Sequence, residues 1–246
     1  MTSFALKTAA LTLGAALGLV AQGRAQSVLT NPPPWTGSVA AGLTATRGNS
    51  ETTVATVTAD AKRKWADEEL LLEGDGTYGD NSGTKSAESI HGCAQFNRSF
   101  TERFYYGLNV DALSDAIADI NYRLTISPLV GYYVIKATND TLKVEAGPGF
   151  VLQKLGATTT GYATLRLAEH YEHKFSDKAK LWQSFEILPQ VNKFKNYYWD
   201  AEIGVETGLT QSISLRTYLQ DTYYAIPASG RLKNDMKLVA AVAYKF

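Results

Sequence analysis

Residues 236–246 read MKLVAAVAYKF, and their side chains fall into two rows that alternate along the chain. One row is apolar or aromatic and consists of Met236, Leu238, Ala240, Val242, Tyr244 and Phe246. The other is small or charged and consists of Lys237, Val239, Ala241, Ala243 and Lys245. A period of two is that of a β-strand, whose successive side chains point to opposite faces of a sheet. Chain ends fray unless other elements hold them, so a strand at the end of the sequence predicts a partner strand beside it.

Eleven further segments alternate in the same way, and none of them fits a helical period well. They lie at 35–46, 52–65, 70–78, 90–97, 104–111, 124–134, 142–152, 163–170, 181–192, 197–209 and 213–223. Most exceed the usual soluble strand length of about 5–6 residues and suit a tilted membrane span of about 9–11. The predicted fold is all-β: a closed antiparallel up-and-down transmembrane β-barrel of about 12 strands, in which the last strand pairs with the first.

The two rows differ in charge, and this difference indicates which row faces lipid. The polar row carries both signs, from Asp60 and Lys62 to Glu206 and Arg216, so that neighbouring strands can pair charges. A membrane barrel turns its apolar row outward and its charged row inward. The sheet is expected to close, because an open edge in lipid leaves N–H and C=O groups unpaired at several kcal/mol each. The alternative is a soluble periplasmic β-protein, which would bury the apolar row.

The connections and the aromatic residues agree with a membrane barrel. Connections after odd-numbered segments, such as DAIADINYR (115–123) and IPASGRLK (226–233), are predicted to be longer than those after even-numbered segments, such as ADE (66–68). Long loops at one end and short turns at the other are typical of outer-membrane barrels. Aromatic residues near segment ends predict girdles at the head groups: Trp35, Trp65, Tyr106, Tyr132, Phe175, Trp199, Tyr223 and Tyr244.

The N-terminal residues predict export. Lys7 precedes an apolar run, 8–21, that is followed by the small residues Gly23 and Ala25, which is the layout of a secretory signal peptide. The run is too short for a membrane helix, which needs about 20 residues, and no later stretch is long enough. The predicted organisation is therefore a signal peptide over 1–25, a short Pro-rich segment over 26–34 and an outer-membrane barrel over 35–246.

The amino-acid composition limits the classes of partner that the protein can have. Lys+Arg and Asp+Glu both number 24, and this balance argues against a nucleic-acid partner. Cys93 is the only cysteine, so an internal disulfide is excluded, and no Cys/His cluster indicates a metal. No cofactor is expected. The expected partners of this outer-membrane protein, a monomer, are outer-membrane lipids and lipopolysaccharide, with the assembly machinery during biogenesis.

The inward row supplies the candidate site residues, which are Glu186, Asp200, Glu202, Glu206, Arg166, Arg216 and His170. The four acids lie on two adjacent strands and could favour cations along a lumen, or the arginines could neutralise them as salt-bridged filling. The leading hypothesis is a structural or stress-related barrel, or a narrow passive pore for small solutes. The alternative is an enzyme acting on lipid or glycan, with His170 as base and Ser184 on the next strand. We find no motif of a hydrolase or nucleotide-binding enzyme, and so predict no catalytic residue.

A few residues do not fit the alternation. Glu169, His173 and Asp221 fall on the outward row, where mid-membrane charge is costly, so a bulge near Ala168 or a position near a rim is expected. The run 147–149, Gly-Pro-Gly, predicts a kink or bulge because proline cannot donate to the ladder.

Three stretches resemble a known family: WTGSVAAGLTATRGNSET (35–52), GPGF (147–150) and the closing AYKF (243–246). They are similar to the domain-of-unknown-function 481 proteins, described as salt-induced outer-membrane proteins. The resemblance covers 35–246 and implies a Gram-negative outer-membrane β-barrel without an established activity and without catalytic residues. Tyr244 and Phe246 also resemble the C-terminal sorting signal that the outer-membrane insertion machinery reads.

Overall fold

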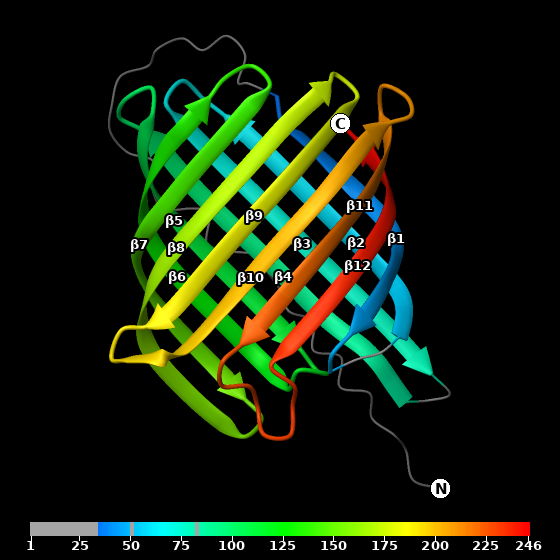
Figure 1. Ribbon diagram of the computed structural model, residues 1–246, viewed down its shortest axis with the longest axis vertical. Coiled ribbons are helices and arrows are strands. Elements are labelled where there is room, and N and C mark those ends of the chain that lie inside the picture. The colour runs from blue at the N-terminus through cyan, green and yellow to red at the C-terminus, as the bar shows by residue number, and fades with distance from the viewer. Residues whose placement is uncertain (1–33, 50–51, 82–83) are drawn as a thin grey trace, which may run out of the picture. The chain divides into compact units, whose positions relative to one another are not determined.

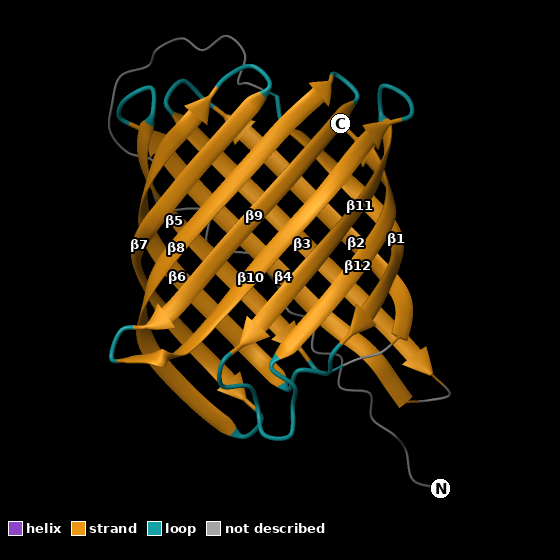
Figure 2. Ribbon diagram, in the orientation of Figure 1, coloured by secondary structure: helices purple, strands orange, loops and turns teal. Residues whose placement is uncertain are grey.

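The computed structural model describes residues 34–49, 52–81 and 84–246, which form twelve antiparallel strands in one barrel (Figure 1). The strands are β1 Thr36–Arg47, β2 Thr52–Lys64, β3 Glu68–Asn81, β4 Thr84–Ser99, β5 Phe104–Asp115, β6 Ile120–Lys136, β7 Asp140–Leu155, β8 Thr158–Ser176, β9 Ala179–Gln190, β10 Lys193–Gly208, β11 Ile213–Tyr224 and β12 Asn234–Lys245. Among the described residues there are strands and connections only (Figure 2). No helix in this part of the chain is long and apolar enough to cross a membrane. The predicted signal peptide lies outside the described residues, as does the Pro-rich segment except for its last residue.

The sheet is a closed ring in sequence order, as predicted. Each strand pairs with its neighbours along the chain, and β12 pairs antiparallel with β1. The backbone of Phe246 continues this ladder: its N–H donates to the Gly37 carbonyl at 3.0 Å and its carbonyl accepts from the Gly37 N–H at 3.1 Å. The end of the sequence is therefore held by the first strand, and the prediction from residues 236–246 is confirmed.

The apolar row faces outward and the polar row faces the interior. Leu43 and Val242 expose 62% and 53% of their surface, whereas the inward Thr44 and Ala243 expose none. Ser127 in β6 is likewise fully buried. This is the reverse of a soluble barrel, in which Leu and Val would fill the interior. It is the arrangement that hydrocarbon requires.

Packing at the seam between β1 and β12 explains why particular residues occur in the 35–52 stretch. A Cβ atom on Gly42 would lie 2.1 Å from the Ala240 carbonyl oxygen, so a side chain there would separate the two strands. Gly48 follows β1 with a φ of 128°, a left-handed conformation that glycine adopts without strain. The next residue, Asn49, accepts from the Leu232 N–H at 2.6 Å and donates its side-chain amide to Asp235 at 2.8 Å. These residues tie the start of the barrel to its last strand.

The prediction about the lengths of the connections is wrong. Connections after odd-numbered strands are not generally longer: only 225–233, between β11 and β12, is clearly long, because the other strands continue into residues predicted as loops. We call the end that carries this connection the loop end, and the opposite end, where Phe246 lies, the turn end (Figure 1).

Of the two alternatives predicted for the outward polar residues, a bulge near Ala168 is absent from the described ladders, where β8 shifts register only at Lys174/Ser176, and a position near a rim holds for His173 and Asp221. Glu169 stays on the outward row, where the Gln183 side chain donates to it. His173 Nδ1 lies 2.7 Å from Asp140 Oδ1 near the turn end. Asp221 accepts from Asn234 at 2.5 Å near the loop end. Side-chain partners, in two of the three cases near a strand end, reduce the cost of these polar groups without a bulge.

The Gly-Pro-Gly run interrupts a ladder without shifting it. Pairing of β6 with β7 runs to Ile126–Phe150 and resumes at Val130–Ala146 in the same register. That register sets Pro128 opposite Pro148, and neither proline has an N–H to donate. Of the predicted kink or bulge, no bulge forms here: the two prolines leave a gap in the hydrogen bonding between β6 and β7.

Aromatic side chains gather on the outer face near both ends. Trp199 and Tyr223 stack at 10° with ring centroids 5.8 Å apart, near the loop end. Phe104 and Tyr132 pack with centroids 4.5 Å apart, near the turn end. Two such bands are the girdles expected at membrane interfaces.

Candidate functional site

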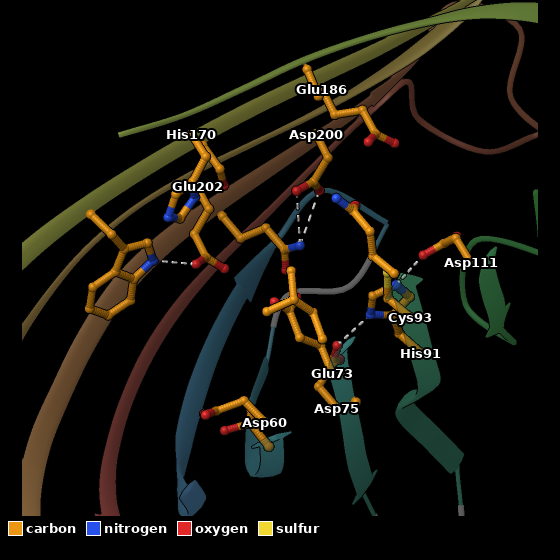
Figure 3. Close-up of a pocket in the computed structure, with 18 of the residues that line it drawn as sticks. Asp60, Glu73, Asp75, His91, Cys93, Asp111, His170, Glu186, Asp200 and Glu202 are labelled. Atoms are coloured by element: carbon orange, nitrogen blue, oxygen red, sulfur yellow. Dashed lines mark hydrogen bonds and ion pairs between the residues drawn. The ribbon is translucent and has the colours of Figure 1, made fainter. Parts of the chain in front are cut away.

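The interior holds a cavity of about 610 Å³, which the inward rows of the strands line (Figure 3). The structure places all seven sequence-predicted residues around it: Glu186, Asp200, Glu202, Glu206, Arg166, Arg216 and His170. They come from β8 to β11, and the opposite wall is supplied by β2 to β5, with Asp60, Glu73, Asp75, His91 and Asp111.

Acidic groups outnumber basic groups on the cavity wall. Twelve carboxylates from the inward rows line it: Asp60, Glu73, Asp75, Asp111, Asp115, Glu145, Glu172, Glu186, Asp200, Glu202, Glu206 and Asp235. The lysines and arginines that line it number seven: Lys62, Arg123, Lys143, Arg166, Lys180, Arg216 and Lys237. A cavity wall with an excess of one sign concentrates ions of the opposite sign.

Arg166 is the centre of one ion-pair network. It is 5% exposed on β8, and it reaches a carboxylate on each neighbouring strand. Its Nη1 lies 2.8 Å from Glu145 Oε2 on β7, and its Nη2 lies 2.6 Å from Glu186 Oε2 on β9. This part of the wall is therefore neutralised locally, as the salt-bridged reading predicted.

Glu145 collects further donors from strands that are not its neighbours. The Tyr105 hydroxyl on β5 donates to Glu145 Oε1 at 2.7 Å, and the Gln95 amide on β4 donates to the same atom at 2.8 Å. Lys143 Nζ lies 3.6 Å away. Because Glu145 is 6% exposed, its charge depends on these partners rather than on water.

Arg216 forms a second network across the closing seam. Its Nε donates to Glu206 at 2.8 Å and its Nη1 to Asp60 at 2.9 Å. Ser38 Oγ donates to the same Asp60 oxygen at 2.5 Å, and Lys245 pairs with Glu206. Five consecutive strands of the ring, β10, β11, β12, β1 and β2, each contribute a side chain to this network, so it fastens the seam from inside.

Asp200 and Glu202 differ from the other two predicted acids. Asp200 accepts from Gln220 at 3.0 Å and from Thr222 at 2.6 Å, and Glu202 accepts from Trp182 Nε1 at 2.5 Å (Figure 3). Within the described chain neither carboxylate takes part in an ion pair. Glu186 and Glu206 are thus paired with arginine, as the salt-bridged interpretation predicted, while Asp200 and Glu202 meet neutral donors only.

His91 lies between two carboxylates on the opposite wall. Its Nδ1 is 2.9 Å from Asp75 Oδ1 on β3, and its Nε2 is 2.5 Å from Asp111 Oδ2 on β5 (Figure 3). A ring with a carboxylate oxygen at each nitrogen donates from both nitrogens, which is the geometry of an imidazolium. Three adjacent strands are joined by this cluster.

His170 does not form a catalytic arrangement in the described residues. It faces the cavity and lies opposite Lys143 on β7 and Ser184 on β9. No hydrogen bond joins His170 to Ser184 among the described side chains, so the base–nucleophile contact of a hydrolase is not formed there. The described residues also contain no group of three His, Cys, Asp or Glu side chains arranged for a metal ion.

The residues that sequence reasoning did not single out are Glu145, His91 and Arg123. The first two lie on inward rows, so the alternation marked them as interior without indicating their partners. Arg123 fell in a stretch predicted as a connection, whereas it is the fourth residue of β6 and is 4% exposed. Its place in the alternation, next to the outward Leu124 and therefore on the inward row, is the only signal that could have identified it.

Comparisons with known proteins agree with this architecture. Residues 39–246 match the model of a family described as "Protein of unknown function, DUF481". A search of curated proteins gives no match.

Among solved structures, the chain is similar to the NanC porin, with 7% identity and a TM-score of 0.59 over 85% of this chain and 100% of that one. It is also similar to the KdgM porin, solved in complex with disordered oligogalacturonate, with 9% identity and a TM-score of 0.49 over 85% of this chain and 99% of that one. The translocator domain of the autotransporter NalP from Neisseria meningitidis matches with 15% identity and a TM-score of 0.49, over 88% of this chain and 90% of that one. At these identities the NanC likeness shows the fold alone, which is that of outer-membrane β-barrels.

Proposed function

The chain belongs to the family described as proteins of unknown function, DUF481, and from that premise we propose that it is an outer-membrane barrel that passes small cations through a narrow acidic lumen. The observation that carries the proposal is the cavity of about 610 Å³ with its excess of carboxylates. A solute that enters this space meets mostly acidic side chains. The field of such a wall raises the local cation concentration and repels anions.

Asp200 and Glu202 are the groups that we assign to cation attraction. The arginine-paired carboxylates, Glu186 and Glu206, contribute little net field because an opposite charge lies within 3 Å of each. Asp200 and Glu202 meet only uncharged donors, so no ion pair cancels the field of either carboxylate when it is ionised. Selectivity is therefore expected to depend on these two.

Replacing these two carboxylates tests the proposal. The double variant Asp200→Asn/Glu202→Gln is expected to lower the cation-over-anion permeability ratio about twofold, because it removes field at the wall and leaves volume nearly unchanged. The ratio is measured as the reversal potential in a planar bilayer that separates unequal KCl solutions.

The matched control is Asp67→Asn/Asp177→Asn, which makes the same charge change at two exposed residues in turns outside the cavity. Its ratio is expected to stay at the wild-type value. Equal effects of the two double variants would remove the role of Asp200 and Glu202. A wild-type protein that is folded and silent in every recording would replace the pore with a structural or stress-related role.

The outer face of the barrel indicates what the protein contacts in the envelope. The apolar band between the two aromatic girdles suits outer-membrane lipids, and we place the turn end in the periplasm and the loop end outside, towards lipopolysaccharide. Export by a signal peptide cleaved near Ala25 belongs to the same proposal. The ring closes within one chain, which is consistent with a monomer.

We assign Tyr244 and Phe246 to recognition by the outer-membrane assembly machinery. Both rings lie on the outward row at the turn end, 58% and 56% exposed, where a partner can reach them. Phe246→Ala is expected to reduce the fraction of chain that assembles in cells several-fold, as measured by heat-modifiable gel migration of the membrane fraction. Phe175→Ala is the control, because Phe175 is 63% exposed near the same end but lies in β8. Equal losses in both variants would assign the effect to lost girdle contacts instead.

A further inference from the structure

Arg123 crosses the interior of the barrel near the loop end. Its guanidinium carbon lies 4.6 Å from the ring centroid of Tyr198 and 4.6 Å from that of Tyr224. Arg123 is in β6, Tyr198 in β10 and Tyr224 is the last residue of β11. In the ring of twelve strands β6 and β11 are five positions apart, almost opposite each other. Inward side chains on such strands meet only through the lumen.

Residues on neighbouring strands support the contact between Arg123 and the two tyrosines. Arg123 Nε donates to Gln153 on β7 at 2.9 Å, which orients the guanidinium. The Tyr198 hydroxyl lies 3.2 Å from Thr125 Oγ1, one inward position further along β6. The guanidinium is thus held by two ring faces and one neutral acceptor, and within the described chain Arg123 takes part in no ion pair.

The connection from β5 to β6 closes over the same place. Ala118 in that connection and Ile120 at the start of β6 are 7% and 2% exposed, and both pack in one cluster with Tyr224. A loop residue that is buried against an inward tyrosine lies inside the barrel mouth. We call Ala118, Ile120, Arg123, Tyr198 and Tyr224 the plug.

We propose that the plug closes the lumen towards the loop end, with the acidic cavity beneath it, and that Arg123 is the residue that holds it shut. The planar guanidinium joins two rings on a facing wall, and a desolvated cation–π contact is stronger than one in water. Its positive charge also opposes cation entry at the mouth. This inference rests on the proposed function, because a plug matters only in a barrel that passes solute. Such a barrel passes solute only while the plug is displaced.

The single cysteine offers a test that does not require conduction. Cys93 lines the cavity, and its Sγ lies 3.2 Å from the Asn109 amide on β5. A small charged methanethiosulfonate reagent is added to one side of proteoliposomes that hold the protein in one orientation. The rate of Cys93 modification is followed by mass. The ratio of the loop-side rate to the turn-side rate cancels the intrinsic reactivity of the thiol.

The wild-type ratio is expected to be well below one, and Arg123→Ala is expected to raise the loop-side rate about tenfold, because a desolvated cation–π contact is lost. Tyr224→Leu is expected to act in the same direction and serves if Arg123→Ala fails to fold, as judged by gel migration of the unboiled protein. Arg231→Ala is the matched control, because Arg231 is exposed in the connection at the same end.

Three possible outcomes of these measurements distinguish the proposal of a plug from the proposal of a pore. A wild-type ratio near one, or unchanged rates in folded Arg123→Ala and Tyr224→Leu, overturns the plug even if bilayers conduct. Faster modification in the variants with a silent bilayer for every protein supports the plug and removes the pore. Faster modification together with larger conductance in Arg123→Ala supports both.

Discussion

Glu145→Ala is expected to lower the free energy of unfolding by about 3–5 kcal/mol, because it removes one partner of a buried ion pair and leaves the other. Arg166 would keep Glu186, but it would lose the carboxylate 2.8 Å from its Nη1. Tyr105 and Gln95 would lose the acceptor that they share on Glu145. Water cannot easily replace that acceptor, since the site is almost fully buried.

Equilibrium urea unfolding of the protein in lipid vesicles measures this loss. Glu172→Ala is the matched control, because Glu172 pairs with Lys174 at 3.8 Å and Lys180 at 3.1 Å, where both lysines are substantially exposed. Exposed pairs contribute about 0–1 kcal/mol, so the control is expected to unfold close to wild type. Similar losses in the two variants would show that burial of the network contributes nothing particular to stability.

Val57→Arg is expected to cost about 2–4 kcal/mol of folding free energy, the depth-dependent cost of a cation at the middle of a membrane. Val57 lies at the centre of β2 with 53% of its surface outward, opposite Ala41 on one side and Gly76 on the other. An arginine there has hydrocarbon on its outer side and no carboxylate opposite it on either neighbouring strand. The variant tests directly that the apolar row faces lipid.

The control for depth is Val191→Arg. Val191 is the same residue type and has a similar exposure of 50%, but it lies in the connection between β9 and β10. Near the interface the cost falls to about 0–1 kcal/mol. The comparison is made by the folded fraction on unboiled gels and by urea midpoints in vesicles. If both variants fold as well as wild type in lipid, the outward row does not contact hydrocarbon.

The strands were predictable because side-chain alternation is a local property of the sequence. Each run, such as 236–246, shows a period of two within its own residues. The excess of charge on one row indicates which face must avoid lipid. Ring closure followed from the same rows, since an open edge is not tolerated in a membrane. Strand ends were less predictable: β6 begins at Ile120, within a stretch that has the composition of a loop.

The site was predictable only as a set of inward residues. Parity marks Arg166 and Glu186 as interior, and their strands are neighbours, so their pairing follows from the sheet order. The contacts of Glu145 with Gln95, and of Arg123 with Tyr224, join strands that are not neighbours. Such contacts depend on the curvature of the closed wall and on how far long side chains reach, and a one-dimensional pattern contains neither.

The facing prolines have a mechanical consequence. Pro128 and Pro148 leave a stretch of the β6–β7 ladder without their N–H donors, so packing alone joins the two strands there. Two strands separate most easily where the hydrogen bonds between them are missing. Under lateral pressure the wall is therefore expected to yield between β6 and β7 at the facing prolines before it yields along the continuous parts of that ladder.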